Sequence, residues 1–159
     1  MDSDRKFLQR TIELAKESAR QGGFPAGAVI VKDGKIIAEG ISISSKLYDP
    51  SAHAETSAIR QACKNFKTTN LQGATIYASM QSCLMCFAAA NWANISKIVY
   101  AYRKTPEMIS KNYYEGRTQN ENINVENNKQ LELLFIPDFE NEVLKIMREW
   151  EKRLNINSK

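Results

Sequence analysis

The stretch Ala28-Val29-Ile30-Val31-Lys32-Asp33-Gly34-Lys35-Ile36-Ile37-Ala38 holds two short apolar runs on either side of a polar turn. Asp-Gly between such runs is a strong β-hairpin signal, because a tight turn between paired strands needs residues that accept positive φ. The sequence therefore predicts two antiparallel strands over 28–31 and 36–38.

Helices and strands alternate around this hairpin. An amphipathic helix is predicted over 4–20, ended by Gln21-Gly22-Gly23. Further helices are predicted over 52–65, 83–93, 105–113 and 138–154, strands over 75–78, 97–101 and 131–136, and polar loops over 42–50 and 116–130. This order indicates a three-layer α/β sandwich, a mixed five-stranded sheet flanked by helices, with the later strands parallel through right-handed crossovers. We treat residues 1–159 as one domain.

Composition narrows the class of protein. The 159 residues are 43% hydrophobic and 25% charged, which excludes a disordered tail, a collagen-like fibre and a disulfide-dense mini-protein. No apolar run approaches the length of a membrane span, and the first ten residues lack a signal-peptide core. We therefore expect a cytoplasmic protein. The net charge of +4 comes without a Lys/Arg block, which argues against a strong nucleic-acid footprint.

The single histidine and two of the three cysteines form a candidate metal site. Cys83 and Cys86 are spaced to share one helix face, and a helix N-terminus favours the thiolate that zinc binds. With His53 they make three ligands and leave a fourth position for water, the arrangement of a catalytic zinc. Cys63 lies about 15 Å along a helix from His53, too far to share the ion, and is expected to be a buried small side chain. The competing interpretations are an ordinary core or surface histidine and two buried thiols.

The sequence resembles the zinc-dependent cytidine/purine deaminase superfamily over about residues 4–102. The matching stretches include Gly27–Val31 with Asp33-Gly34, Asp49–Glu55, Ala58–Arg60, Cys83–Phe87 and Trp92-Ala93. The superfamily pattern is H-x-E followed by P-C-x-x-C. The resemblance is closest to the branch of guanine, guanosine and tRNA adenosine deaminases. Residues 103–159, which the resemblance does not cover, are then the part of the domain that diverges more from the family.

The resemblance implies a cytidine deaminase-like fold and a zinc-dependent hydrolytic deaminase. One Zn²⁺ per chain would be held by His53, Cys83 and Cys86, and Glu55 would move protons between water, the ring nitrogen and the leaving amine without binding the metal. Residues 53 and 55 do not share a face of a regular helix, so helix geometry alone does not explain how both reach one pocket.

Three departures from the family concern substrate contacts. Ser82 stands where the family usually has Pro, and is expected to cap the helix that follows it. Ser42 stands where a Gly-x-Asn segment usually supplies an amide that contacts the base. The segment Asn112-Tyr113-Tyr114-Glu115 replaces an acidic pair of the bacterial guanine deaminases, and their terminal aromatic is absent. These changes predict an active deaminase with diverged specificity.

The predicted substrate is a small aminated heterocycle, a purine base or nucleoside of guanine or guanosine type. Family resemblance nominates the substrate contacts Phe24, Ala28, Ser42, Ala54, Ser82, Trp92, Tyr114 and Glu115, although Phe24, Trp92, Tyr113 and Tyr114 also suit plain packing. The alternatives are a tRNA adenosine deaminase, a cytosine-type base deaminase and a non-catalytic zinc-binding descendant. Family habit implies a homodimer, and Trp150 and Leu154 of the last helix suit core or dimer contact.

Overall fold

The computed structural model describes residues 2–157 and contains one five-stranded sheet with strand order β2-β1-β3-β4-β5. The strands are β1 (Gly27–Lys32), β2 (Lys35–Ile41), β3 (Thr75–Ala78), β4 (Lys97–Tyr100) and β5 (Glu132–Phe135). The helices are α1 (Asp2–Arg20), α2 (Ser44–Leu47), α3 (Ala54–Phe66), α4 (Leu84–Trp92), α5 (Pro106–Ser110), α6 (Asn120–Asn124) and α7 (Glu140–Asn157), the last preceded by the 3₁₀ turn η1 (Pro137–Phe139).

The predicted hairpin is confirmed. β1 and β2 pair antiparallel, and Asp33 and Gly34 both have positive φ, 51° and 72°, as a two-residue turn between twisted strands requires. β1 also pairs antiparallel with β3, while β3, β4 and β5 run parallel to one another. The mixed sheet with parallel later strands therefore agrees with the prediction.

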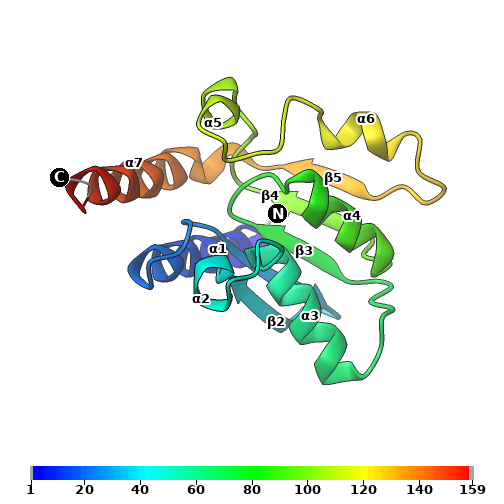
Figure 1. Cartoon of the computed structure of the whole chain (residues 1–159). Helices are drawn as coiled ribbons and strands as arrows, with labels where there is room; N and C mark the ends of the chain where they lie inside the picture. The colour runs from blue at the N-terminus through cyan, green and yellow to red at the C-terminus, as the bar shows by residue number, and fades with distance from the viewer. Residues whose placement is uncertain (1, 158–159) are drawn as a thin grey trace.

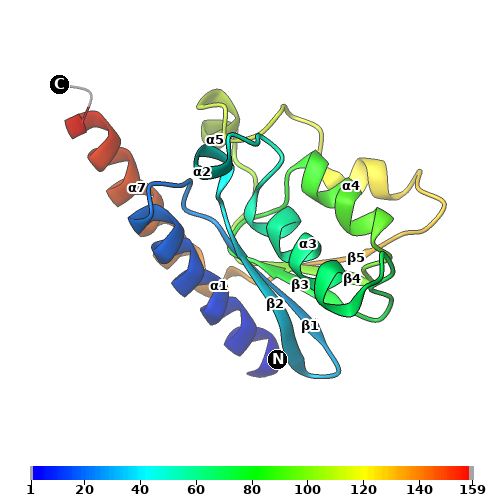
Figure 2. The same cartoon turned by 60° about the horizontal axis from the view of Figure 1, so that its bottom comes forward.

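Two helical layers enclose the sheet. α1 and α7 lie side by side on one face, and α3 and α4 cover the other (Figures 1 and 2). Both faces are apolar, since Val29 and Val31 of β1 face α1 and α7, whereas Ala28 and Ile30 face α3 and α4. The three-layer α/β sandwich predicted from the sequence is confirmed.

The sequence prediction was wrong for several short segments. The predicted loops 42–50 and 116–130 contain the single-turn helices α2 and α6, which have too few residues to show apolar periodicity. The predicted helix 105–113 stops at Ser110, because Asn112 turns the chain with a φ of 60°. The last helix begins at Glu140, since Pro137 starts a 3₁₀ turn first.

α3 lies very close to β2 at its N-terminal end. A Cβ atom added to Gly40 would lie 2.1 Å from the carbonyl oxygen of Ala54, so only glycine allows this approach. The contact brings the start of α3 to the edge of the sheet where β3 ends.

No helix among residues 2–157 has the length and apolar character needed to cross a membrane.

Candidate active site

His53 occupies the N-cap position of α3, outside the helix itself. Its backbone is extended, with φ −75° and ψ 171°, and its amide donates to Thr56 Oγ1 at 3.0 Å. The preceding turn is fastened by Asp49, which accepts from the Ser51 amide at 2.8 Å, and by Arg60, which donates to Ser51 Oγ at 2.7 Å. Because His53 precedes the first helical residue, it and Glu55 can both face one pocket, which a regular helix would not allow.

Cys83 occupies the corresponding position at the start of α4. Its backbone is also extended, with φ −68° and ψ 170°, and its sulfur accepts from the amide of Cys86 at 3.5 Å. The prediction that Ser82 caps this helix was therefore wrong, because the thiol of Cys83 takes that role. Cys83 and Cys86 both lie at the positive end of the α4 dipole, which stabilises negative charge on sulfur.

The three predicted ligands converge. His53 Nδ1 lies 3.5 Å from Cys83 Sγ and 3.6 Å from Cys86 Sγ, and the ligand atoms all lie within 4.8 Å of one another. Zinc bond lengths of about 2.0–2.3 Å in a tetrahedron put neighbouring ligand atoms about 3.5–3.8 Å apart. The donor set and spacing therefore fit one Zn²⁺ with one position left open.

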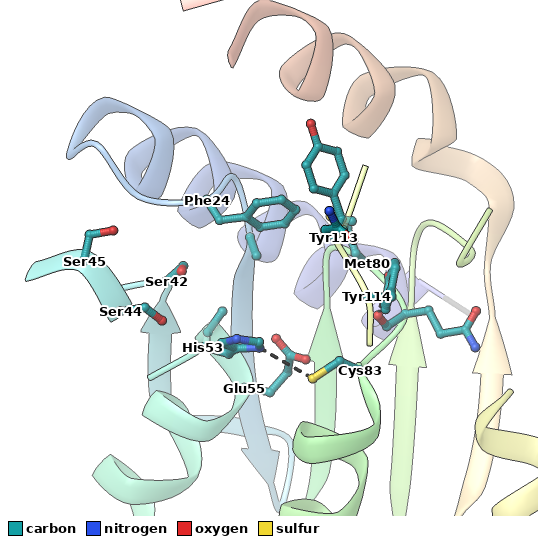
Figure 3. Close-up of a pocket in the computed structure, with 14 residues that line it drawn as sticks. Phe24, Ser42, Ser44, Ser45, His53, Glu55, Met80, Cys83, Tyr113 and Tyr114 are labelled. Atoms are coloured by element: carbon teal, nitrogen blue, oxygen red, sulfur yellow. Dashed lines mark hydrogen bonds between the residues drawn. The ribbon is translucent and has the colours of Figure 1, made fainter. Parts of the chain in front are cut away.

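Glu55 lies beside this cluster in the first turn of α3. It is buried, it lines the pocket, and Figure 3 shows its carboxyl group pointing up between His53 and Cys83. Burial away from water raises the pKa of Glu55, a direction that favours proton uptake. Among residues 2–157, the three-residue metal cluster includes neither Glu55 nor Cys63, which lies half-buried farther along α3.

The two thiols and the imidazole influence one another strongly. A hydrogen bond with Cys86 lowers the pKa of Cys83 to about 7, while the same hydrogen bond and burial raise the pKa of Cys86. A hydrogen bond with Cys83 raises the pKa of His53. A divalent cation held by these residues would stabilise negative charge on both sulfurs.

A cavity of about 250 Å³ opens above these residues. Four of the predicted substrate contacts line it, namely Phe24, Ser42, Ala54 and Tyr114. Figure 3 shows Ser42, Ser44 and Ser45 along one side, with Phe24 above the cluster and Tyr113, Tyr114 and Met80 opposite the serines. The cavity thus has hydroxyl groups on one wall and aromatic rings on the other.

Four other predicted contacts do not line this cavity. Ala28 is fully buried in the sheet, and Ser82 is buried beneath the start of α4. Trp92, at the far end of α4, is 86% exposed and is neither in the cavity nor in the core. Glu115 accepts from the amides of Leu84 and Met85 at 3.4 and 3.3 Å, so its carboxylate caps α4.

The sequence prediction missed several residues around the site. Gln81 lines the cavity and accepts the Tyr114 hydroxyl on its carbonyl oxygen at 2.6 Å. Asn120, from the segment predicted to be a solvated loop, is buried and donates to the carbonyl oxygen of Ser82 at 2.8 Å. Nothing in an asparagine-rich stretch distinguishes the one side chain that turns inward. Ser44, Ser45, Met80 and Asn112 also line the cavity.

Comparisons with known proteins agree with this geometry. The sequence profile described as the cytidine and deoxycytidylate deaminase zinc-binding region matches residues 1–102. Guanine deaminase of Bacillus subtilis is 46% identical over 100 residues, 62% of this chain and 64% of that protein. The tRNA-specific adenosine deaminase of Aquifex aeolicus is 37% identical over 95 residues, 60% of this chain and 63% of that protein. The matched part thus spans less than two thirds of the length of these relatives.

The likeness in structure extends further along the chain. A structure from studies of A-to-I editing by tRNA:A34 deaminases superposes with a TM-score of 0.77 and 25% identity, covering 89% of this chain and 99% of that one. The likeness in fold therefore extends beyond residues 1–102, which the family profile matches. Together with the His53, Cys83 and Cys86 cluster, these matches show that the chain belongs to the cytidine and deoxycytidylate deaminase zinc-binding family.

Proposed function

We propose that the protein is a zinc-dependent deaminase that hydrolyses the exocyclic amine of a purine base or nucleoside of guanine or guanosine type. The observation that carries the proposal is the position of Glu55, whose buried carboxyl group faces the pocket beside the three metal-binding atoms without belonging to their cluster. A purely structural zinc site has no use for such a carboxylate.

In the proposed reaction, water adds to the ring carbon that bears the amine, the carbon–nitrogen bond breaks, and ammonia leaves. Zinc held by His53, Cys83 and Cys86 supplies Lewis acidity toward water. Glu55 would take one proton from the attacking water and pass it to the ring nitrogen. It would then take the remaining proton from the hydroxyl of the adduct and give it to the amine, so that ammonia leaves and a carbonyl forms. Burial, which raises the pKa of Glu55, favours the proton-accepting part of this role.

The cavity supports a flat ring with polar edges. Its volume of about 250 Å³ suits a small molecule, and the rings of Phe24, Tyr113 and Tyr114 offer apolar surface to a heterocycle. Ser42 and Ser45, on the opposite wall, offer hydroxyl groups that can donate or accept hydrogen bonds. Ser42 replaces the family's usual amide, so we keep guanine and guanosine as alternatives within one proposal.

Since zinc needs reduced thiols, we also propose a cytoplasmic location.

The test is ammonia release from the zinc-loaded protein with guanine, guanosine, adenine, adenosine, cytosine and cytidine. We expect release from at least one guanine compound. Stoichiometric zinc without ammonia from any of the six would favour a non-catalytic zinc-binding descendant. Release from cytosine or cytidine alone would favour the cytosine-type alternative.

The second candidate function is deamination of adenosine in tRNA, because several relatives carry that name. Such a function needs basic groups for phosphates, and residues 103–159, with ten acidic and ten basic side chains, have no net charge. Filter binding with transfer RNA at increasing salt distinguishes the two. Binding that weakens steeply with salt, followed by conversion of adenosine to inosine, would favour this candidate.

We also propose that two copies of the chain associate through the outer face of α4. Residues 68–96 contain no charged side chain, and Leu84, Ala88 and Trp92 are spaced to share a face of α4 that ends in the exposed indole. A symmetric dimer sets such a face against itself, which an uncharged surface permits without repulsion. Trp92→Glu is expected to give a monomer in sedimentation, whereas Tyr48→Glu, at a 95% exposed side chain, should leave the dimer intact. A monomeric unaltered protein would contradict this proposal.

A further inference from the structure

Two walls of the cavity are built from side chains outside any helix or strand. Phe24 follows α1, and Tyr113 follows α5. Local hydrogen bonds hold the backbone, since the Ser18 hydroxyl donates to the Phe24 carbonyl oxygen at 2.6 Å and the Tyr113 amide donates to the Met108 carbonyl oxygen at 2.9 Å. The orientation of the two rings depends in addition on what packs behind them. Both pack against α7, which lies on the face of the sheet opposite α3 and α4.

Trp150 of α7 lies behind both rings. Its ring centroid is 5.2 Å from that of Phe24 and 5.8 Å from that of Tyr113, and the Phe24 and Tyr113 centroids are 5.2 Å apart. The interplanar angles of 65–74° are edge-to-face arrangements, which are favourable for aromatic pairs. Trp150 does not itself line the cavity. It therefore braces the two rings that do.

Glu151, the next residue of α7, fastens the same segment by polar contacts. Its Oε1 accepts the Tyr113 hydroxyl at 3.0 Å and the Lys111 ammonium at 3.0 Å. Lys111 also pairs with Glu107 of α5 at 2.7 Å, and Arg148 of α7 lies 3.6 Å from that same carboxylate. Side chains of α7 thus hold both α5 and the turn that carries Tyr113.

We propose that Trp150 and Glu151 are positioning residues that hold Phe24 and Tyr113 as the aromatic walls of the pocket, and so set its affinity for the ring of the substrate. The inference rests on the proposed deaminase function and adds to it a role for α7. The metal-binding residues and Glu55 lie at the N-terminal ends of α3 and α4, on the other side of the sheet. The brace therefore acts on substrate binding and leaves the bond-breaking groups in place.

The test compares steady-state kinetics of Trp150→Ala with the unaltered zinc-loaded enzyme on the guanine compound that it deaminates. We expect KM to rise about tenfold while kcat stays within about twofold, because binding weakens and the chemical step does not. Trp150→Phe should recover most of the affinity, since a smaller ring still meets both walls. Phe66→Ala, which removes a 57% exposed ring at the far end of α3, is the matched control and should leave both constants unchanged.

A second pair of variants tests the polar contact. Tyr113→Phe removes only the hydroxyl that Glu151 accepts, and Glu151→Ala removes that bond and the Lys111 pair, so we expect KM to rise in both and more in the second. Glu149→Gln, on the exposed side of α7, is the control. An unchanged KM in Trp150→Ala, or a loss of kcat that merely follows the amount of folded protein, overturns the inference alone. Absence of ammonia from the unaltered enzyme overturns the proposed function and the inference with it.

Discussion

His53 and Cys83 stand at equivalent positions of two neighbouring helices. Each is the N-cap residue, each has φ near −70° and ψ near 170°, and their Nδ1 and Sγ atoms lie 3.5 Å apart. Two helix N-termini therefore point at one spot, and both favour negative charge there. Thiolates and the oxygen of an activated water are stabilised in such a place, so the fold prepares the site electrostatically before a cation is added.

We expect the purified protein to hold one zinc ion per chain. Cys86→Ser is expected to lose it, because serine does not replace a thiolate as a zinc ligand at this position. Cys63→Ser, which changes a cysteine outside the cluster, is the matched control and should keep the metal. Metal analysis of the dialysed proteins gives the measurement, and circular dichroism checks that each variant is folded. Full zinc in Cys86→Ser would refute the proposed ligand set.

Replacement of Glu55 by Gln separates metal binding from turnover. The amide fills the same space and cannot move a proton, so ammonia release should fall about 10²- to 10⁴-fold while the zinc content stays the same. The exposed Glu126→Gln serves as the control and should deaminate normally. Turnover that persists in Glu55→Gln would remove the proton shuttle from the mechanism.

Asn120→Ala tests the support beneath Cys83. The buried amide donates to the Ser82 carbonyl oxygen, and its loss leaves that oxygen without the bond, at a cost of about 1–3 kcal/mol in the free energy of unfolding. Asn122→Ala, two residues along and exposed, should stay within about 0.5 kcal/mol. Denaturant titration of the zinc-loaded proteins measures the free energy of unfolding of each variant. Equal losses in the two variants would show that the inward position of Asn120 has no special role.

Acid stability should depend on the pairing of Arg10 with Glu39, which ties α1 to β2. Hydrogen bonds from Arg10 at 2.8 and 2.9 Å lower the pKa of Glu39 in the folded protein. A lowered folded pKa gives stability that is present above the unfolded value of about 4.3 and is lost as pH falls through the folded value. Urea unfolding should therefore show Glu39→Gln to be less stable than the unaltered protein near neutral pH, with the difference shrinking toward about pH 3. A difference that does not change with pH would argue that the carboxylate's charge is irrelevant.

Elements with a strong local pattern could be predicted from the sequence. The Asp33-Gly34 hairpin, the long amphipathic helix α1 and the apolar strands β3 and β4 each have a periodicity or a turn signal that decides their conformation. The donor types of His53, Cys83 and Cys86 indicated a candidate zinc site, and the family resemblance strengthened the prediction that they converge. Their spacing along the chain does not itself reveal that both helices begin at the same edge of the sheet.

The pocket walls were harder to predict, because tertiary contacts place them. Tyr113 lies in the cavity because α5 ends at Ser110 and Asn112 then turns the chain. Glu115 does not line the cavity, because its carboxylate accepts from the amides of Leu84 and Met85 at the start of α4. Trp92 lies on the same face of α4 as the exposed Ala88, whereas Ala90 and Ala93 beside it are buried, so its indole faces away from the core. In a helix as apolar as α4, the sequence does not show which face packs against the sheet.

Residues 103–159 lie outside the matched family profile, yet Tyr113, Tyr114 and the Trp150 brace all come from them. These residues are thus separate in sequence from the metal-binding residues, although Phe24 and Ser42 of the same cavity belong to residues 1–102. Substitutions in residues 103–159 could change the substrate preference while the metal-binding residues stay the same. A protein engineer could graft this C-terminal third onto a relative to change that relative's substrate preference.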